Sequence, residues 1–162
     1  MSEFILELCN ITKIFPGVKA LDGVNFQLRA GEIHALMGEH GAGKSTFIKV
    51  ITGVHHAEGG TMFLDGKKVE FKTPLDAQRA GIAAIYQHVT SYPHLSVAEI
   101  IFMGHESVKG GMIQWKEMHK RADLLLKRLT AEFSSAALMS SLSVAQQQMV
   151  EIAKALSMDA RI

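Results

Sequence analysis

The feature that most constrains this chain is the stretch 38–46, which reads Gly-Glu-His-Gly-Ala-Gly-Lys-Ser-Thr. It fits the pattern G-x-x-x-x-G-K-[ST], in which a glycine-rich loop binds phosphate through its backbone N–H groups. Glycine lets the backbone curl around an anion without a clash from a Cβ atom. Lys44 adds a positive charge on a flexible stem, and the Ser45 hydroxyl is a suitable Mg²⁺ ligand. The candidate binding residues are Gly38, Glu39, His40, Gly41, Ala42, Gly43, Lys44, Ser45 and Thr46.

The flanking sequence agrees with this interpretation, because a phosphate loop of this type lies between a strand and a helix. Residues 33–37 before the loop are mostly apolar and predict a buried strand. Residues 46–52 after the loop place apolar side chains on one face, and Gly53 suits a helix C-terminus. The alternative is a glycine-rich turn without a ligand, which would leave Lys44 and two of the glycines unexplained.

Composition narrows the class of protein further. The 162 residues are 48% hydrophobic and 20% charged, which favours a globular domain with a sizeable core. A net charge of +1 gives no basic excess for nucleic acid or an anionic membrane surface. The single cysteine, Cys9, excludes an intrachain disulfide and fits a reducing cytoplasm. The first residues do not resemble a signal peptide, and no apolar run approaches the roughly 18 residues that span a bilayer. We therefore expect no nucleic-acid partner and no direct membrane insertion.

The hydrophobic pattern predicts an α/β fold whose character changes along the chain. Apolar runs at 33–37 and 82–86 predict two buried, parallel strands at the centre of a sheet. From Ser96 onward we expect helices and no strand. The other predicted elements are strands at 4–11 and 24–29, a hairpin across 61–69 with an Asp65-Gly66 turn, a helix opened by Thr73-Pro74, and helices beginning at Ser96, Trp115 and Ser143.

Two further motifs follow the phosphate loop in order. Ile85-Tyr86-Gln87 ends a predicted strand, and residues 142–148, Leu-Ser-Val-Ala-Gln-Gln-Gln, begin a predicted helix. Together with the loop they resemble the Q-loop and signature motif of ABC transporter nucleotide-binding domains. The stretches 15–21 and 148–156 are most similar to ATP-binding subunits of bacterial monosaccharide importers of the ribose and galactose type. The resemblance runs along the whole chain.

The resemblance implies a P-loop NTPase core of the RecA-like type, with an antiparallel β subdomain and a helical subdomain. It assigns residues 1–88 to the core, 89–156 to the helical subdomain that ends in the signature helix, and 157–162 to the start of the Walker-B strand. The family continues beyond that point with the Walker-B aspartate and the catalytic glutamate. We therefore expect an N-terminal fragment, truncated before the Walker-B strand, with no catalytic residue in this chain and no ATP hydrolysis by it alone.

The resemblance also assigns roles to individual residues, with ATP and Mg²⁺ as cofactors. It implies that Phe15 stacks on adenine and that Gln87 contacts Mg²⁺ and the attacking water. It implies that Ser143, Ala145 and Gln146 close on the γ-phosphate of ATP bound by a second domain. Each assignment has a structural alternative: a core or turn aromatic for Phe15, a polar strand end for Gln87, and a helix N-cap for Ser143.

Several positions depart from the family pattern. His40 stands where the family usually has Asn, and both residue types tolerate a left-handed backbone. Ala145 replaces the second glycine of the signature, and His88 replaces a common acidic residue. The adjacent His55 and His56 lack thiol or carboxylate partners at metal-ligand spacing, so we expect a solvated loop there.

The implied function is an ATP-binding subunit, an ATPase by family, that energises a sugar importer. Its partners would be a transmembrane permease subunit and a second nucleotide-binding domain. It would lie in the cytoplasm, peripheral to the inner membrane through the permease. Two alternatives stay open: a soluble, non-transport ABC ATPase and a nucleotide-binding relic without turnover. Residues 89–113 distinguish the importer from the non-transport ATPase, because in importers this segment receives a cytoplasmic helix of the permease.

Overall fold

The computed structural model describes residues 3–86 and 92–162, and the chain divides into two compact units, Met1–Ala80 and Gly81–Ile162. Gln87 and His88 lie outside the described residues. The functional boundary at residue 88 stays a prediction. Each unit is described by itself below.

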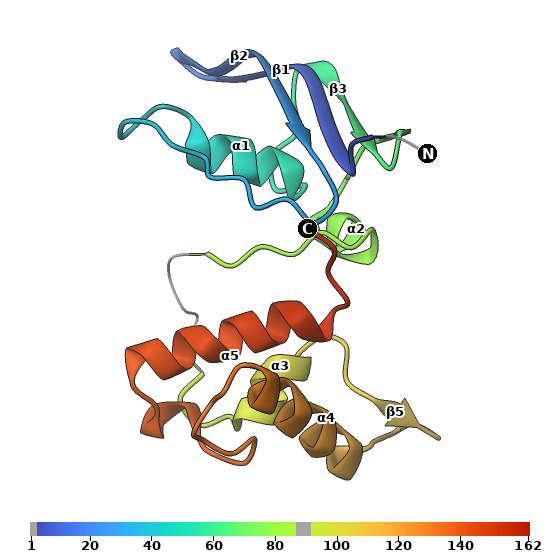
Figure 1. Ribbon diagram of the computed structural model, residues 1–162, viewed down its shortest axis with the longest axis vertical. Helices are drawn as coiled ribbons and strands as arrows, with labels where there is room; N and C mark the ends of the chain where they lie inside the picture. The colour runs from blue at the N-terminus through green and yellow to red at the C-terminus, as the bar shows by residue number, and fades with distance from the viewer. Residues whose placement is uncertain (1–2, 87–91) are drawn as a thin grey trace. The chain divides into compact units, whose positions relative to one another are not determined.

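The first unit contains a four-stranded antiparallel sheet in the order β2-β1-β3-β4 (Figure 1). Its strands are β1 (Leu6–Phe15), β2 (Val18–Leu28), β3 (Gly59–Leu64) and β4 (Lys67–Val69). Leu6 and Leu8 of β1 are buried while Glu7 is only partly covered, as expected for a strand with one face on a core. The sheet confirms the predicted early strands and lengthens both of them.

The predicted hairpin is also confirmed. Leu64 pairs with Lys67 across the turn, and the two turn residues, Asp65 and Gly66, have φ values of 50° and 74°. Positive φ at both positions is the requirement of the type I′ turn, which Asp-Gly meets at low cost.

Two helices complete the first unit. Helix α1 (Lys44–Ile51) buries Phe47, and the Phe47 ring lies 5.1 Å from that of Phe26 on β2, so the helix packs on the sheet (Figure 1). Helix α2 (Pro74–Arg79) begins at Thr73, whose hydroxyl accepts the Asp76 N–H while the Asp76 carboxylate accepts the Thr73 N–H. This reciprocal cap confirms the helix predicted at Thr73-Pro74.

The two predicted central parallel strands are wrong for this structure. Residues 33–37 and 82–86 belong to no strand, and Ile33 is 99% exposed and Met37 87% exposed. A buried strand needs neighbours that pair its backbone and cover its faces. In the first unit no described strand pairs with 33–37, so its apolar side chains face solvent. Residues 81–83 make three backbone hydrogen bonds with 161–162, including Ala83 N–H to the Ile162 carbonyl at 2.8 Å, which is the beginning of a pairing but not a strand.

The second unit is mainly helical. Helices α3 (Val97–Phe102), α4 (Trp115–Arg128) and α5 (Val144–Ser157) contact one another, and a 3₁₀ turn, Met139–Ser141, precedes α5 (Figure 1). Their shared core consists mainly of fully buried aliphatic side chains and Phe102. Its most buried members are Val97, Ala98, Ile101, Phe102, Ala122, Met139, Val150 and Ala153. The three predicted helices are confirmed here.

Two details of the second unit differ from expectation. A short hairpin, β5 (Val108–Lys109) and β6 (Met112–Ile113), forms where no strand was expected, because Gly110 and Gly111 both adopt positive φ. The apolar spacing of the helix that begins at Ser143 predicts that Ile152 points inward, but Ile152 on α5 is 40% exposed.

Candidate functional site

The glycines of the stretch 38–46 provide the backbone geometry of a tight loop. Gly38, Gly41 and Gly43 have φ values of 154°, 85° and 85°. Among the non-glycine residues that the structure describes, positive φ occurs at Asn10, Asp65, Thr130 and Asp159. His40 therefore adopts no left-handed conformation, and its replacement of the usual Asn puts no strain on the loop.

Gly43 joins the loop to α1 and cannot carry a side chain. A Cβ atom at Gly43 would lie 2.5 Å from the Ala20 carbonyl oxygen and 3.1 Å from Leu21 Cδ2 of β2. Gly43 is also the N-cap of α1, and its carbonyl accepts the Phe47 N–H at 2.8 Å. The close approach fixes the start of the helix against the sheet.

Lys44 folds back over the loop that precedes it. Its ammonium donates hydrogen bonds of 2.7 Å to the carbonyl oxygens of both Gly38 and Glu39. A charged donor shared between two carbonyls holds the loop closed. The cation therefore lies against the backbone of the loop.

The N-terminus of α1 suits an anion. Gly43 offers no capping side chain, and the first turn of the described helix contains no acidic residue. Its free N–H groups and the helix dipole are thus available to a phosphate. The Ser45 side chain is exposed in this turn, and Thr46 follows it half-buried. The residues fit a nucleotide phosphate, and Ser45 fits a metal bound to it.

Phe15 ends β1 in the same unit and is half-buried. Its ring makes a T-shaped contact with the His55 ring, at a centroid distance of 5.2 Å and an interplanar angle of 74°. The Lys13 ammonium lies over the ring, 5.2 Å from its centroid. The adenine-stacking role of Phe15 stays a prediction, but the ring is held by named neighbours that the sequence did not reveal.

Ser143 is the N-cap of α5. Its hydroxyl accepts the Gln146 N–H at 3.4 Å, and the Gln146 side-chain oxygen accepts the Ser143 N–H at 2.9 Å. The structural alternative for Ser143 is therefore confirmed, while its role toward a second domain stays a prediction. Ala145 is exposed in the first turn, so its methyl group projects from the surface of this unit.

Gln147, which the sequence analysis gave no role, fixes the entry into this helix. Its amide nitrogen donates hydrogen bonds of 3.1 Å to the carbonyl oxygens of Met139 and Leu142. Those two carbonyls belong to the turn before α5, so the side chain ties the turn to the helix. The sequence signal that could have revealed this role is a glutamine one helical turn after an N-cap serine.

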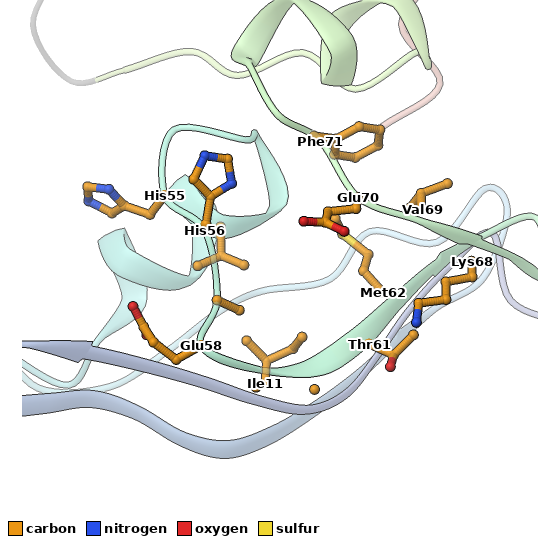
Figure 2. Close-up of a pocket in the computed structure, with 14 residues that line it drawn as sticks. Ile11, His55, His56, Glu58, Thr61, Met62, Lys68, Val69, Glu70 and Phe71 are labelled. Atoms are coloured by element: carbon orange, nitrogen blue, oxygen red, sulfur yellow. The ribbon is translucent and has the colours of Figure 1, made fainter.

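A cavity of about 200 Å³ in the first unit is a different feature (Figure 2). Figure 2 shows Glu58 and His55 at one side of it, with Lys68 of β4 and Glu70, which follows β4, at the other side. The residues of the phosphate loop, all described, are not among its lining residues. This cavity is therefore separate from the phosphate loop.

Within residues 3–86 and 92–162, no three His, Cys, Asp or Glu side chains are grouped so that they could hold a metal ion. In the same part of the chain, no helix has both the length and the apolar character needed to cross a bilayer.

A closed glycine loop, a lysine folded onto it and a helix beginning at that lysine define a phosphate-loop nucleotide-binding protein. Within that class, the family model described as "ABC transporter" matches residues 21–162. The chain belongs to this family.

Relatives and solved structures agree. A putative ribose/galactose/methyl galactoside import ATP-binding protein of Burkholderia ambifaria is 49% identical over 98% of this chain and 31% of its own length. A xylose import ATP-binding protein of Thermoanaerobacter pseudethanolicus is 49% identical over 100% and 32%. The chain thus spans about a third of the length of these curated relatives.

Two solved structures show the same fold. An ATP-binding cassette of an ABC transporter in its ADP conformation matches with a TM-score of 0.83 and 29% identity, over 98% of this chain and 66% of that one. A dimeric bacterial ABC transporter cassette matches with a TM-score of 0.75 and 28% identity, over 96% and 70%. The predicted fold class, a P-loop NTPase core with an antiparallel sheet and a helical part, is confirmed at this level.

Proposed function

We propose that the chain is the nucleotide-binding part of an ATP-driven sugar importer, with the phosphates of ATP bound by residues 38–46. The observation that carries this is the position of Lys44, whose ammonium lies on the carbonyls of Gly38 and Glu39 beside the uncapped start of α1. Family membership and the printed names of the relatives support ATP as the nucleotide.

Each residue of the loop has a defined task in this proposal. The backbone N–H groups at the start of α1 donate to phosphate oxygens, and Lys44 exchanges one or both carbonyls for a phosphate. The Ser45 hydroxyl holds Mg²⁺, which neutralises charge on the phosphates when it is bound. Phe15 presents an aromatic ring to the adenine. Gln87, outside the described residues, is assigned to the metal.

The signature residues act on a second nucleotide-binding domain. Ser143, Ala145 and Gln146 start a helix, and a helix N-terminus attracts the γ-phosphate of ATP held by the partner domain. The dimeric cassette among the matched structures supports this arrangement. Closure of the dimer around ATP then moves a transmembrane permease, to which the protein attaches at the cytoplasmic face of the inner membrane.

Co-purification with a membrane subunit tests the importer proposal. The chain is produced with a tag in cells that carry a sugar permease, and detergent extracts are captured on the tag. Retention of the permease by the unaltered chain, and its loss when the exposed residues Tyr92, Val108 and Met112 are replaced by Ser while the buried residues of α3 are kept, supports an importer. ATP binding without any retained permease would instead favour a non-transport ABC ATPase.

A further inference from the structure

A cluster of charged and aromatic side chains surrounds the end of β1. Lys13 and Phe15 are two positions apart on this strand, so their side chains lie on the same face of the sheet. The Lys13 ammonium lies over the Phe15 ring at 5.2 Å, within the range of a cation–π interaction. The His55 ring makes a T-shaped contact with the same phenyl group.

Glu58 connects this cluster to the neighbouring strand. Its carboxylate accepts the Lys13 ammonium at 2.5 Å and the Ile14 N–H at 2.7 Å. Its own N–H donates to the Thr12 carbonyl at 2.9 Å, just before β3 begins. One residue thus binds three successive positions of β1, and the contacts fix the backbone that carries Phe15.

The ion pair differs from an ordinary surface pair in its burial. The Lys13 side chain is 12% exposed, whereas that of Glu58 is 44% exposed. A lysine side chain that is mostly covered keeps its charge in place more firmly when a carboxylate partner compensates that charge. Without the Glu58 charge, Lys13 would turn toward solvent and leave the ring.

We propose that Lys13 and Glu58 are positioning residues for base recognition: Glu58 anchors the Lys13 ammonium over the Phe15 ring, and the ring is thereby held for a purine base to stack on it. This inference rests on the proposed nucleotide site. The hydrogen bond from Lys13, followed by the one from the Ile14 N–H, holds the pKa of Glu58 below its usual value, which agrees with an anchor that is charged near neutral pH.

The test measures the contribution of the base to binding separately from that of the phosphates. Isothermal titration calorimetry of the full chain measures the affinity for MgATP and for magnesium tripolyphosphate, which has no base. Lys13→Met and Glu58→Gln should each weaken ATP binding about three- to fivefold, the scale of a cation–π contact. Tripolyphosphate binding should stay within about twofold, because the phosphate loop is unchanged. Lys13→Arg keeps a cation over the ring and should retain the affinity for ATP.

Asp22→Asn is the matched control, because it breaks another Lys–carboxylate pair, Lys19–Asp22 at 3.1 Å on β2. It should change neither affinity. Any of three results would overturn the positioning role alone. They are an equal loss of affinity for both ligands in the Lys13 and Glu58 variants, unchanged ATP affinity in both variants, and a loss of ATP affinity in Lys13→Arg. If the unaltered chain bound neither ligand, the proposed function would be wrong and this inference with it.

Discussion

The Lys44 ammonium lies 2.7 Å from the Gly38 carbonyl oxygen, so the side chain bridges the two ends of its own loop. The same ammonium reaches the Glu39 carbonyl at an equal distance. Removing the amine would therefore take away both of these hydrogen bonds and, in the proposed function, the cation that meets the phosphates.

Lys44→Ala should weaken ATP binding by about tenfold to a hundredfold, since a hydrogen bond to a charged group is worth about 1.5–3 kcal/mol. Titration with a fluorescent ATP analogue measures the change. Lys49→Ala removes a lysine from the last turn of the same helix and serves as the control. Equal affinities for Lys44→Ala and the unaltered chain would remove the basis of the phosphate site.

Gly43→Ala should destabilise the first unit by roughly 2–4 kcal/mol, from backbone strain and from a forced shift of β2. The new methyl group would lie 2.5 Å from the Ala20 carbonyl oxygen. Gly41→Ala is the matched control, because Gly41 has the same φ of 85° but open space around its Cβ position. It should cost about 1–2 kcal/mol. Urea unfolding of both variants checks the order, and equal losses would contradict the close contact with β2.

Glu99 should make the second unit sensitive to acid. The hydrogen bond from the Ser96 hydroxyl, followed by the one from the Ser96 N–H, lowers the pKa of Glu99. A carboxylate whose pKa is lower when folded stabilises the fold above its unfolded pKa, and this contribution disappears as the pH falls through the folded pKa.

The experiment follows urea unfolding from pH 7 to pH 3 for the unaltered chain and for Glu99→Gln. The variant should be less stable at neutral pH by about 1 kcal/mol, the usual scale of a helix cap, and the difference should shrink as the pH falls. Glu132→Gln, at an exposed position, is the control. A gap between Glu99→Gln and the unaltered chain that is constant with pH would refute the charge-based cap.

Ala145→Gly should increase ATP-dependent self-association. If the start of α5 approaches the γ-phosphate of a second domain, the Ala145 methyl group lengthens the hydrogen bonds that its N-terminus donates. Sedimentation velocity with a non-hydrolysable ATP analogue should show a larger dimer fraction with Gly. Ala155→Gly, near the other end of the helix, controls for helix propensity and should show no gain. Equal dimer fractions for Ala145→Gly and the unaltered chain would mean that the methyl group is accommodated.

The features that the sequence predicted correctly are those determined by interactions between neighbouring residues. The Asp65-Gly66 turn follows from residues that accept positive φ. The caps at Thr73, Ser96 and Ser143 each join a hydroxyl to a side chain three positions later. The positive φ values of Gly38, Gly41 and Gly43 are of the same local kind, while the phosphate-binding role of their loop stays a prediction.

The features that only the tertiary structure decided depend on contacts between residues that are far apart in the chain. The apolar runs 33–37 and 82–86 have the composition of buried strands, but a strand exists only where another strand pairs with it, and these runs belong to none. The anchoring of Lys13 by Glu58 joins positions that no local pattern links. A sequence by itself determines which backbone conformations each segment favours, because that energy is local. Which segments meet is decided by long-range pairing and burial, and these are properties of the folded chain.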